Sequence, residues 1–188
     1  MKRVLMLVLL AAFVATGLFA GGAAEDDGTS IGIAIPSADH GWTGGIVWWA
    51  NKRVAELEEQ YGDQFDFTIV TADSPSTQVR DVENLMSRGI DFLVILPHES
   101  APLTPIVKEA QASGIRCIVV DRGLTETDFG YVNLAGDTAQ LGRLSGEWLA
   151  EQMMERSNGG NLVVMGGLPV EIDKERMDAF FAVINEYP

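Results

Sequence analysis

The sequence predicts an α/β fold built on one open, parallel, Rossmann-like β-sheet. Short runs rich in β-branched residues alternate with longer stretches whose apolar residues recur with a helical period. The strand runs are almost continuously apolar, as in "DFLVIL" at 91–96, which is typical of strands buried on both faces. Right-handed crossovers between parallel strands then leave few possible topologies. The 188 residues have room for one domain of ordinary size and a remainder.

The first half of the chain predicts three strand–helix units. The first pairs strand 30–35 with helix 43–60, whose apolar stripe consists of Ile46, Val47, Ala50, Val54 and Leu57. The second pairs strand 66–72 with a helix that begins at Ser76 and stops at Gly89, and its apolar face consists of Val79, Val82, Leu85 and Met86. The third pairs strand 91–96 with helix 103–113, which Gly114 closes.

The second half continues the alternation. Strand 115–120 is followed by a short fifth strand at 130–134 and a long helix at 138–156. In that helix we expect the inward residues to be Leu141, Leu144, Trp148 and Leu149. A sixth strand is expected at 161–167 and a last helix at 173–186. The helical tryptophans Trp48, Trp49 and Trp148 are interpreted as packing residues.

Residues 1–24 have the pattern of a secretory signal peptide. Lys2 and Arg3 form a basic start, residues 4–14 are apolar, and small residues at 20–24 offer several cleavage positions. The apolar run falls short of the roughly 20 residues of a membrane span. Gly21 stands where a lipoprotein would carry a cysteine. We therefore expect a periplasmic or extracytoplasmic protein without a membrane anchor in its mature form; an uncleaved N-terminal anchor is the alternative.

The formal net charge of −14 argues against nucleic acid as a partner, because contact with a phosphate backbone needs a basic patch. The charge agrees with a small or neutral ligand. The only cysteine, Cys117, lies in an apolar run and is expected to be a small buried side chain.

Polar and aromatic residues follow the predicted strands. In open parallel sheets, ligands bind outside the carboxyl ends of the strands. The residues at that edge are Asp39, His40 and Trp42; Asp73 and Ser74; His98 and Glu99; Asp121 and Arg122; and Gly166 and Gly167. The edge is therefore the expected site.

Several common site chemistries lack their motifs. The first strand leads into "PSADHGWTGG" rather than G-x-G-x-x-G, and the sequence has neither a Walker P-loop nor a G-x-S-x-G elbow. Two histidines and one cysteine supply no cluster for zinc, so no metal or cofactor is expected. Asp39 and Asp121 could flank a glycosidic bond, which leaves an exported α/β hydrolase open as an alternative.

A neutral polyol fits the edge residues better. Sugar hydroxyls both donate and accept, so a carboxylate beside a guanidinium satisfies both sides of one sugar edge. An aromatic ring covers the C–H face of the sugar. Trp42, Asp121 and Arg122 provide these groups. Each also has a structural reading, Trp42 as packing at the helix start and Asp121–Arg122 as a surface ion pair, while Asp39 is as well suited to capping the helix.

From about Thr29 onward the chain resembles the type I periplasmic binding proteins of bacterial ATP-driven importers, in particular those of the ribose and galactose kind. The likeness is carried by "IAIPSADHGW", "SRGIDFLVILPHES" with "IRCIVVDRG", "GDTAQLGRLSGEWL" and "KERMDAF". It implies that His40 and Trp42, next to Asp39, contact the sugar from the first loop. It implies that Asp121 and Arg122 hold hydroxyls and that Arg176 contributes from a second lobe, although Met177 stands where the family commonly has glycine.

The resemblance also implies the organisation and role of the whole protein. Residues 28–134 would form one full lobe and 135–188 part of the second, with a hinge crossing near 134–137. The protein would be a receptor, not an enzyme, that binds a monosaccharide-like sugar between its lobes and delivers it to the permease of an ABC importer. A sugar- or autoinducer-sensing protein of the same fold remains an alternative. The effector domain of a sugar-responsive repressor is disfavoured, because a signal peptide stands where its DNA-binding motif would be.

Overall fold

The computed structural model describes residues 28–38, 40–157, 160–168 and 170–187. The predicted signal peptide and Asp39 lie outside these ranges. Within them, no helix is both long and apolar enough to cross a membrane.

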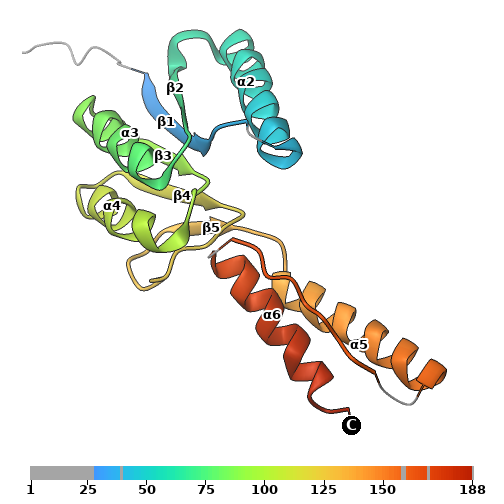
Figure 1. Cartoon of the computed structure of the whole chain (residues 1–188). Helices are drawn as coiled ribbons and strands as arrows, with labels where there is room; N and C mark the ends of the chain where they lie inside the picture. The colour runs from blue at the N-terminus through green and yellow to red at the C-terminus, as the bar shows by residue number, and fades with distance from the viewer. Residues whose placement is uncertain (1–27, 39, 158–159, 169, 188) are drawn as a thin grey trace, which may run out of the picture.

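Five parallel strands form one sheet, as the sequence predicts (Figure 1). In chain order they are β1 (Thr29–Pro36), β2 (Phe65–Ala72), β3 (Phe92–Ile95), β4 (Arg116–Val120) and β5 (Val132–Leu134). Their spatial order is β2-β1-β3-β4-β5, and the register places Ala34 beside Val70 on one side and Ile95 on the other. The reversal of order at β1 puts the carboxyl ends of β1, β3 and β4 next to one another, where an open α/β sheet binds ligands.

The described helices alternate with the strands as far as β4 and begin at or up to three residues before their predicted starts, while α3, α4 and α6 end one or two residues early. They are α2 (Gly41–Tyr61), α3 (Pro75–Ser87), α4 (Ser100–Ala112), α5 (Thr138–Ser157) and α6 (Glu171–Ile184), with a 3₁₀ turn at Gly62–Gln64. α3 begins at Pro75 because Ser74 Oγ accepts a hydrogen bond from the Thr77 backbone N–H at 3.2 Å. Gly89 and Gly114 follow the ends of α3 and α4 with φ of +77° and +93°, which confirms both predicted stops.

The main core lies between the sheet and the helices α3 and α4 (Figure 1). It includes Val82 and Leu85 of α3, and the predicted face residues Val79 and Met86 pack against it. Cys117 is buried in this core, as predicted.

The opposite face of the sheet is covered by α2 near β1 and β2. Between α2 and the sheet lies an apolar cavity of about 670 Å³. Its lining includes Ile33 of β1, Val94 of β3, and Trp42 and Trp49 of α2. This face is therefore less completely packed than the α3–α4 face.

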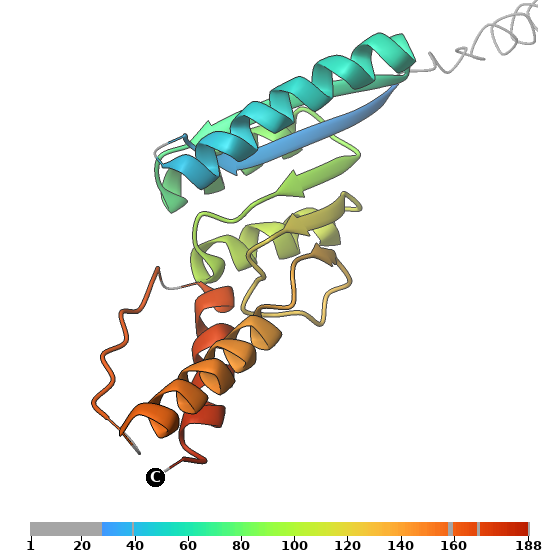
Figure 2. The same cartoon turned by 90° about the vertical axis from the view of Figure 1, so that its right-hand side faces the viewer.

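α5 and α6 lie side by side and project away from the sheet, and we call them the α5–α6 pair (Figures 1 and 2). Small residues of α5 face α6: Gly142, Gly146 and Ala150 are buried. A Cβ atom built at Gly142 would lie 2.1 Å from the Arg176 carbonyl oxygen. The two helices approach so closely only because α5 presents glycine at that point.

Three sequence predictions are wrong in this region and on α2. Residues 161–167 form no strand: Val163 and Met165 are 87% and 91% exposed, and no described strand lies beside them to pair with. The expected inward residues Leu141, Leu144 and Trp148 are exposed, because the small residues of α5 take the contact with α6. Trp48 and Trp49 are exposed as well; they stack edge to face at 4.6 Å with Lys52 near both rings.

Candidate functional site

Asp121 ends β4 in an unusual backbone conformation. Its φ is +61°, the one non-glycine residue in the left-handed region among those described. Its backbone N–H donates to the Leu134 carbonyl at 2.9 Å, which joins the end of β4 to β5. Left-handed φ is uncommon outside glycine, asparagine and aspartate and costs conformational energy. The turn places Asp121 and Arg122 at the carboxyl edge of the sheet.

Arg122 is a buried cation held by the neighbouring strand's loop. Its side chain is 7% exposed. Nη1 donates to the His98 carbonyl at 2.7 Å and to the Pro97 carbonyl at 3.3 Å, both just after β3. In the described part of the chain these carbonyls are its hydrogen-bond partners, and no carboxylate forms an ion pair with it. A buried guanidinium has five donors, so most of its hydrogen-bonding capacity is left for another partner.

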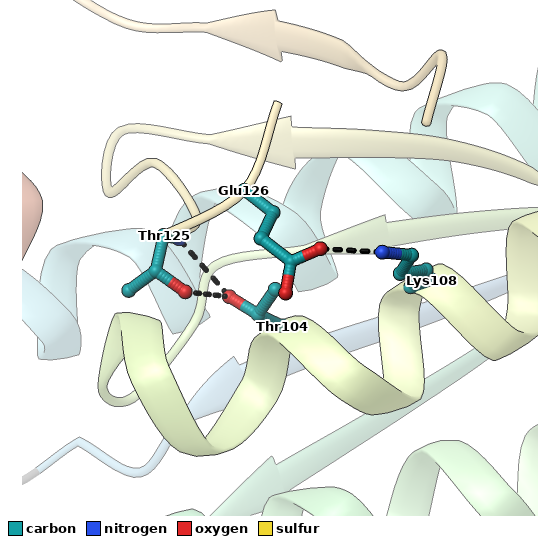
Figure 3. Close-up of polar contacts among 4 residues, drawn as sticks. All are labelled: Thr104, Lys108, Thr125 and Glu126. Carbon is teal, nitrogen blue, oxygen red and sulfur yellow. Dashed lines mark hydrogen bonds and ion pairs between the residues drawn. The ribbon is translucent and has the colours of Figure 1, made fainter. Parts of the chain in front are cut away.

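The loop after Arg122 is fastened to α4 (Figure 3). Thr125 donates its backbone N–H to Thr104 Oγ1 at 3.0 Å, and the two hydroxyls lie 3.0 Å apart. Lys108 forms an ion pair with Glu126 on the surface, and this hydrogen bond raises the pKa of Lys108 above its ordinary value. These contacts fix the end of the Asp121–Glu126 segment, and the hydrogen bond from the Asp121 N–H to the Leu134 carbonyl fixes its start.

The loop between β1 and α2 supplies His40 and Trp42. His40 is the N-cap of α2 with extended backbone, and its carbonyl accepts from the Gly44 N–H at 2.8 Å. The His40 N–H also faces Thr43 Oγ1 at 3.4 Å, so the residue has the capping role that its position allows. Trp42 is 60% exposed and lines the apolar cavity beneath α2. The residue therefore borders both this cavity and solvent.

The α5–α6 pair meets the sheet near the same edge. The Glu171 backbone N–H, at the start of α6, donates to Ser100 Oγ at 3.1 Å, at the start of α4. Arg176 lies five residues further along α6, about 7.5 Å along its axis. Two buried side-chain nitrogens among the described residues lack a hydrogen-bond partner: Arg176 Nε and His98 Nδ1. Unsatisfied buried polar atoms are rare and call for a partner that the protein does not supply.

The structure brings some of the predicted residues together and separates others. Asp121 and Arg122 are adjacent at the edge, and Arg122 donates a hydrogen bond to the His98 carbonyl. His98 is another of the residues that the sequence predicted at this edge. The Glu171–Ser100 contact brings the start of α6 to this edge, and Arg176 lies further along the helix. Asp39 lies outside the described residues. The acids and histidines form no group of three that could hold a metal ion in the described ranges.

Gln78 is the functional candidate that sequence reasoning missed. It is fully buried on α3, and it bonds to the ends of both β1 and β3. The available signal was its spacing: Gln78, Val82 and Leu85 lie on one helical stripe, so a polar amide points into the core. A buried polar side chain needs partners, and here they belong to the edge of the site.

The family comparison covers most of the described chain. A family model described as "Periplasmic binding protein domain" matches residues 31–188.

Curated relatives bind pentoses and related sugars, by their names. The chain is 34% identical over 95 residues to the D-xylose-binding periplasmic protein of Escherichia coli strain K12, a match that covers 50% of this chain and 27% of the relative. It is 31% identical over 104 residues to the D-ribose/D-allose-binding protein of Pseudomonas aeruginosa, covering 51% of this chain and 33% of the relative. The match therefore spans about a third or less of these relatives.

Solved structures match over more of the chain. The fructose-binding periplasmic domain of a hybrid two-component system is 32% identical, with a TM-score of 0.67 over 85% of this chain and 51% of that chain. A periplasmic ribose ABC transporter protein from Conexibacter woesei is 22% identical, with a TM-score of 0.63 over 88% of this chain and 53% of that chain. The second likeness concerns the fold alone.

Proposed function

The chain belongs to the periplasmic binding protein family, and on that premise we propose that it is part of an extracytoplasmic receptor for a monosaccharide-like sugar. The observation that carries the proposal is Arg122. It is a buried guanidinium at the carboxyl edge of a parallel sheet, with one nitrogen fixed to backbone carbonyls. Its remaining donors are available for a ligand at the edge where such folds bind one.

The chemistry of this edge suits a neutral polyol. Arg122 donates to sugar oxygens, and the Asp121 carboxylate beside it accepts from sugar hydroxyls. Each hydrogen bond to a charged group contributes about 1.5–3 kcal/mol. Trp42, with a largely exposed ring, offers the apolar surface for the C–H face of the sugar. His40 and Asp39, which precede Trp42 in the sequence, complete the proposed contacts from this part of the chain.

In this proposal, the second group of sugar-binding side chains comes from the α5–α6 pair. Arg176 has a buried Nε without a partner, and α6 reaches the sheet through the Glu171–Ser100 contact. We place residues 28–134 in a first lobe and 135–188 in part of a second, with the sugar between them. Ligand contact with both lobes favours a closed arrangement over an open one, which is a hinge motion.

The protein in this proposal is not an enzyme. It is exported by the signal peptide at 1–24, and its closed form delivers the sugar to the permease of an ABC importer. The names of the relatives support the sugar-binding part of this role: one is a D-xylose-binding periplasmic protein and another a D-ribose/D-allose-binding protein.

A sensory role is the second candidate. The fructose-binding domain of the hybrid two-component system shares 32% identity and the fold of this chain. The sugar site would be the same and the partner would be a sensor protein instead of a permease. Co-purification of the native protein with an importer permease or with a sensor kinase separates the two.

The site is tested by comparing two arginine variants of the purified protein for binding of D-xylose, D-ribose and D-fructose by isothermal titration calorimetry. Arg122→Ala should weaken binding at least about tenfold, because it removes hydrogen bonds to a charged group. Arg88→Ala is the matched control, since Arg88 is exposed at the end of α3, and it should leave affinity unchanged. Equal affinity of Arg122→Ala and the parent protein would overturn the assignment.

A further inference from the structure

Gln78 is a buried amide in which both N–H donors and the oxygen acceptor are hydrogen-bonded. Its side chain is 0% exposed. Nε2 donates to the Leu96 carbonyl at 2.8 Å and to the Ala34 carbonyl at 3.2 Å, and Oε1 accepts from the His98 N–H at 2.7 Å. One side chain on α3 thus joins the end of β1 to the segment that follows β3.

That segment is the one on which Arg122 rests. Gln78 holds Leu96 and His98, the residues on either side of Pro97. Arg122 Nη1 donates to the carbonyls of Pro97 and His98. The amide and the guanidinium therefore both bind the segment 96–98 and share His98, so the position of the guanidinium depends on that of the amide.

Pro97 explains why the segment needs this support. Proline has no backbone N–H, so the ladder of the sheet cannot continue through it, and β3 ends at Ile95. The neighbouring polar groups, the Leu96 carbonyl and the His98 N–H, are then bonded by Gln78. Without the amide, the Leu96 carbonyl and the His98 N–H would each lose a hydrogen-bond partner in a mostly buried environment. The backbone would then shift to recover a hydrogen bond.

We propose that Gln78 is a positioning residue for the ligand-binding guanidinium: it sets the Pro97–His98 carbonyls that aim Arg122 at the ligand. The part of this inference that concerns ligand rests on the proposed function. The part that concerns Arg122 geometry does not.

The geometric part is tested by NMR of the protein labelled with ¹⁵N-arginine. The Arg122 guanidinium signals are assigned by their loss in Arg122→Ala. Gln78→Met keeps the volume but removes the amide, and it should speed hydrogen exchange at Arg122 Nη1 at least about tenfold. Val82→Ala is the matched control: Val82 lies one turn along the same stripe and is fully buried, so it perturbs the same core without touching residues 96–98. Unchanged Arg122 exchange in Gln78→Met, or an equal change in Val82→Ala, would overturn the proposal.

The ligand part is read in the same proteins at a temperature where all are folded. Gln78→Met should weaken sugar binding about tenfold or more, and Val82→Ala should change it less than twofold. If no sugar binds to the parent protein, the proposed function has failed, and if Arg122→Ala leaves binding unchanged, the assignment of Arg122 to the sugar site has failed; in both cases the NMR result still decides the role of Gln78. If Gln78→Met does not fold, the parent protein decides: the His98 N–H should be protected from exchange by Gln78, and rapid exchange there contradicts the proposal.

Discussion

Replacing Gly142 with alanine should separate α6 from α5. A Cβ at this position would lie 2.1 Å from the Arg176 carbonyl oxygen and 2.9 Å from its carbonyl carbon. An ordinary contact is about 3.5 Å, so the helices would have to part by roughly 1.4 Å. The obstacle is backbone, so no side chain can rotate away. Overpacking of this kind costs about 1–3 kcal/mol, and we expect the upper part of that range.

Alanine also favours helix over glycine by about 1 kcal/mol, which offsets part of this cost. The net loss of stability, about 1–2 kcal/mol, should be confined to the α5–α6 pair. Because 1.4 kcal/mol is a factor of ten in an equilibrium constant, hydrogen exchange in residues 171–184 should become roughly tenfold faster. Hydrogen exchange with mass spectrometry measures this change. Because Arg176 lies on α6, sugar affinity should fall with it.

Gly45→Ala is the matched control, because Gly45 lies inside α2 and nothing lies within 4 Å of a Cβ built there. It should stabilise α2 by up to about 1 kcal/mol and leave exchange in α6 unchanged. If Gly142→Ala leaves α6 as protected as in the parent protein, the close helix contact described here is wrong.

Two further predictions concern the sheet and its edge. Burial raises the pKa of the Cys117 thiol from 9.0 to about 11, so at pH 8 its thiolate fraction should be about a hundredth of the ordinary value, and alkylation should be slow in the native protein and fast in urea. Since the folded state favours the protonated thiol, its contribution to the free energy of unfolding is complete below pH 9 and is lost as the pH rises to 11, by about 2–3 kcal/mol. Over this pH range the free energy of unfolding in urea should therefore fall more steeply for the parent protein than for Cys117→Ala. An equal decline in both proteins would contradict the prediction. Thr104→Val removes the acceptor of the Thr125 N–H and should destabilise the Asp121–Glu126 segment by about 1 kcal/mol, seen as faster proteolysis or exchange there, whereas Thr138→Val on α5 should leave that segment unchanged.

The strands of the sheet could be predicted from the sequence because buried strands are continuously apolar. Continuous apolar runs and the glycine stops at Gly89 and Gly114 reflect local energetics that a single sequence displays. The predicted strand at 161–167 failed for the complementary reason. A strand is stable only beside another strand, and among the described residues none lies next to this segment.

Helix packing in the α5–α6 pair could not be read from large apolar residues. The contact is made by Gly142, Gly146 and Ala150, while Leu141, Leu144 and Trp148 are exposed. A pattern of apolar residues marks one face of a helix, but close approach of two backbones selects small residues instead.

The sequence predicted which residues lie at the carboxyl edge of the sheet, but not the contacts that hold Arg122 there. The strand-end rule placed Asp121 and Arg122 among the edge residues, and the chemistry of a polyol and the family resemblance singled them out. Their contact with a sugar stays a prediction. The partners of Arg122 are backbone carbonyls at Pro97 and His98, and a sequence carries no signal for them. The same holds for the left-handed turn at Asp121, which follows from its link to β5.

Saturation-transfer difference NMR of the purified protein with a panel of monosaccharides tests the central claim most directly, since it detects even millimolar binding. D-xylose, D-ribose, D-fructose and D-glucose form the panel, and an amino acid such as glycine is the negative control. We predict transfer to at least one sugar. The dissociation constant obtained by titrating that sugar should be at least about tenfold larger for Arg122→Ala and unchanged for Arg88→Ala. Absence of transfer to every sugar, or an unchanged dissociation constant for Arg122→Ala, would contradict the proposal.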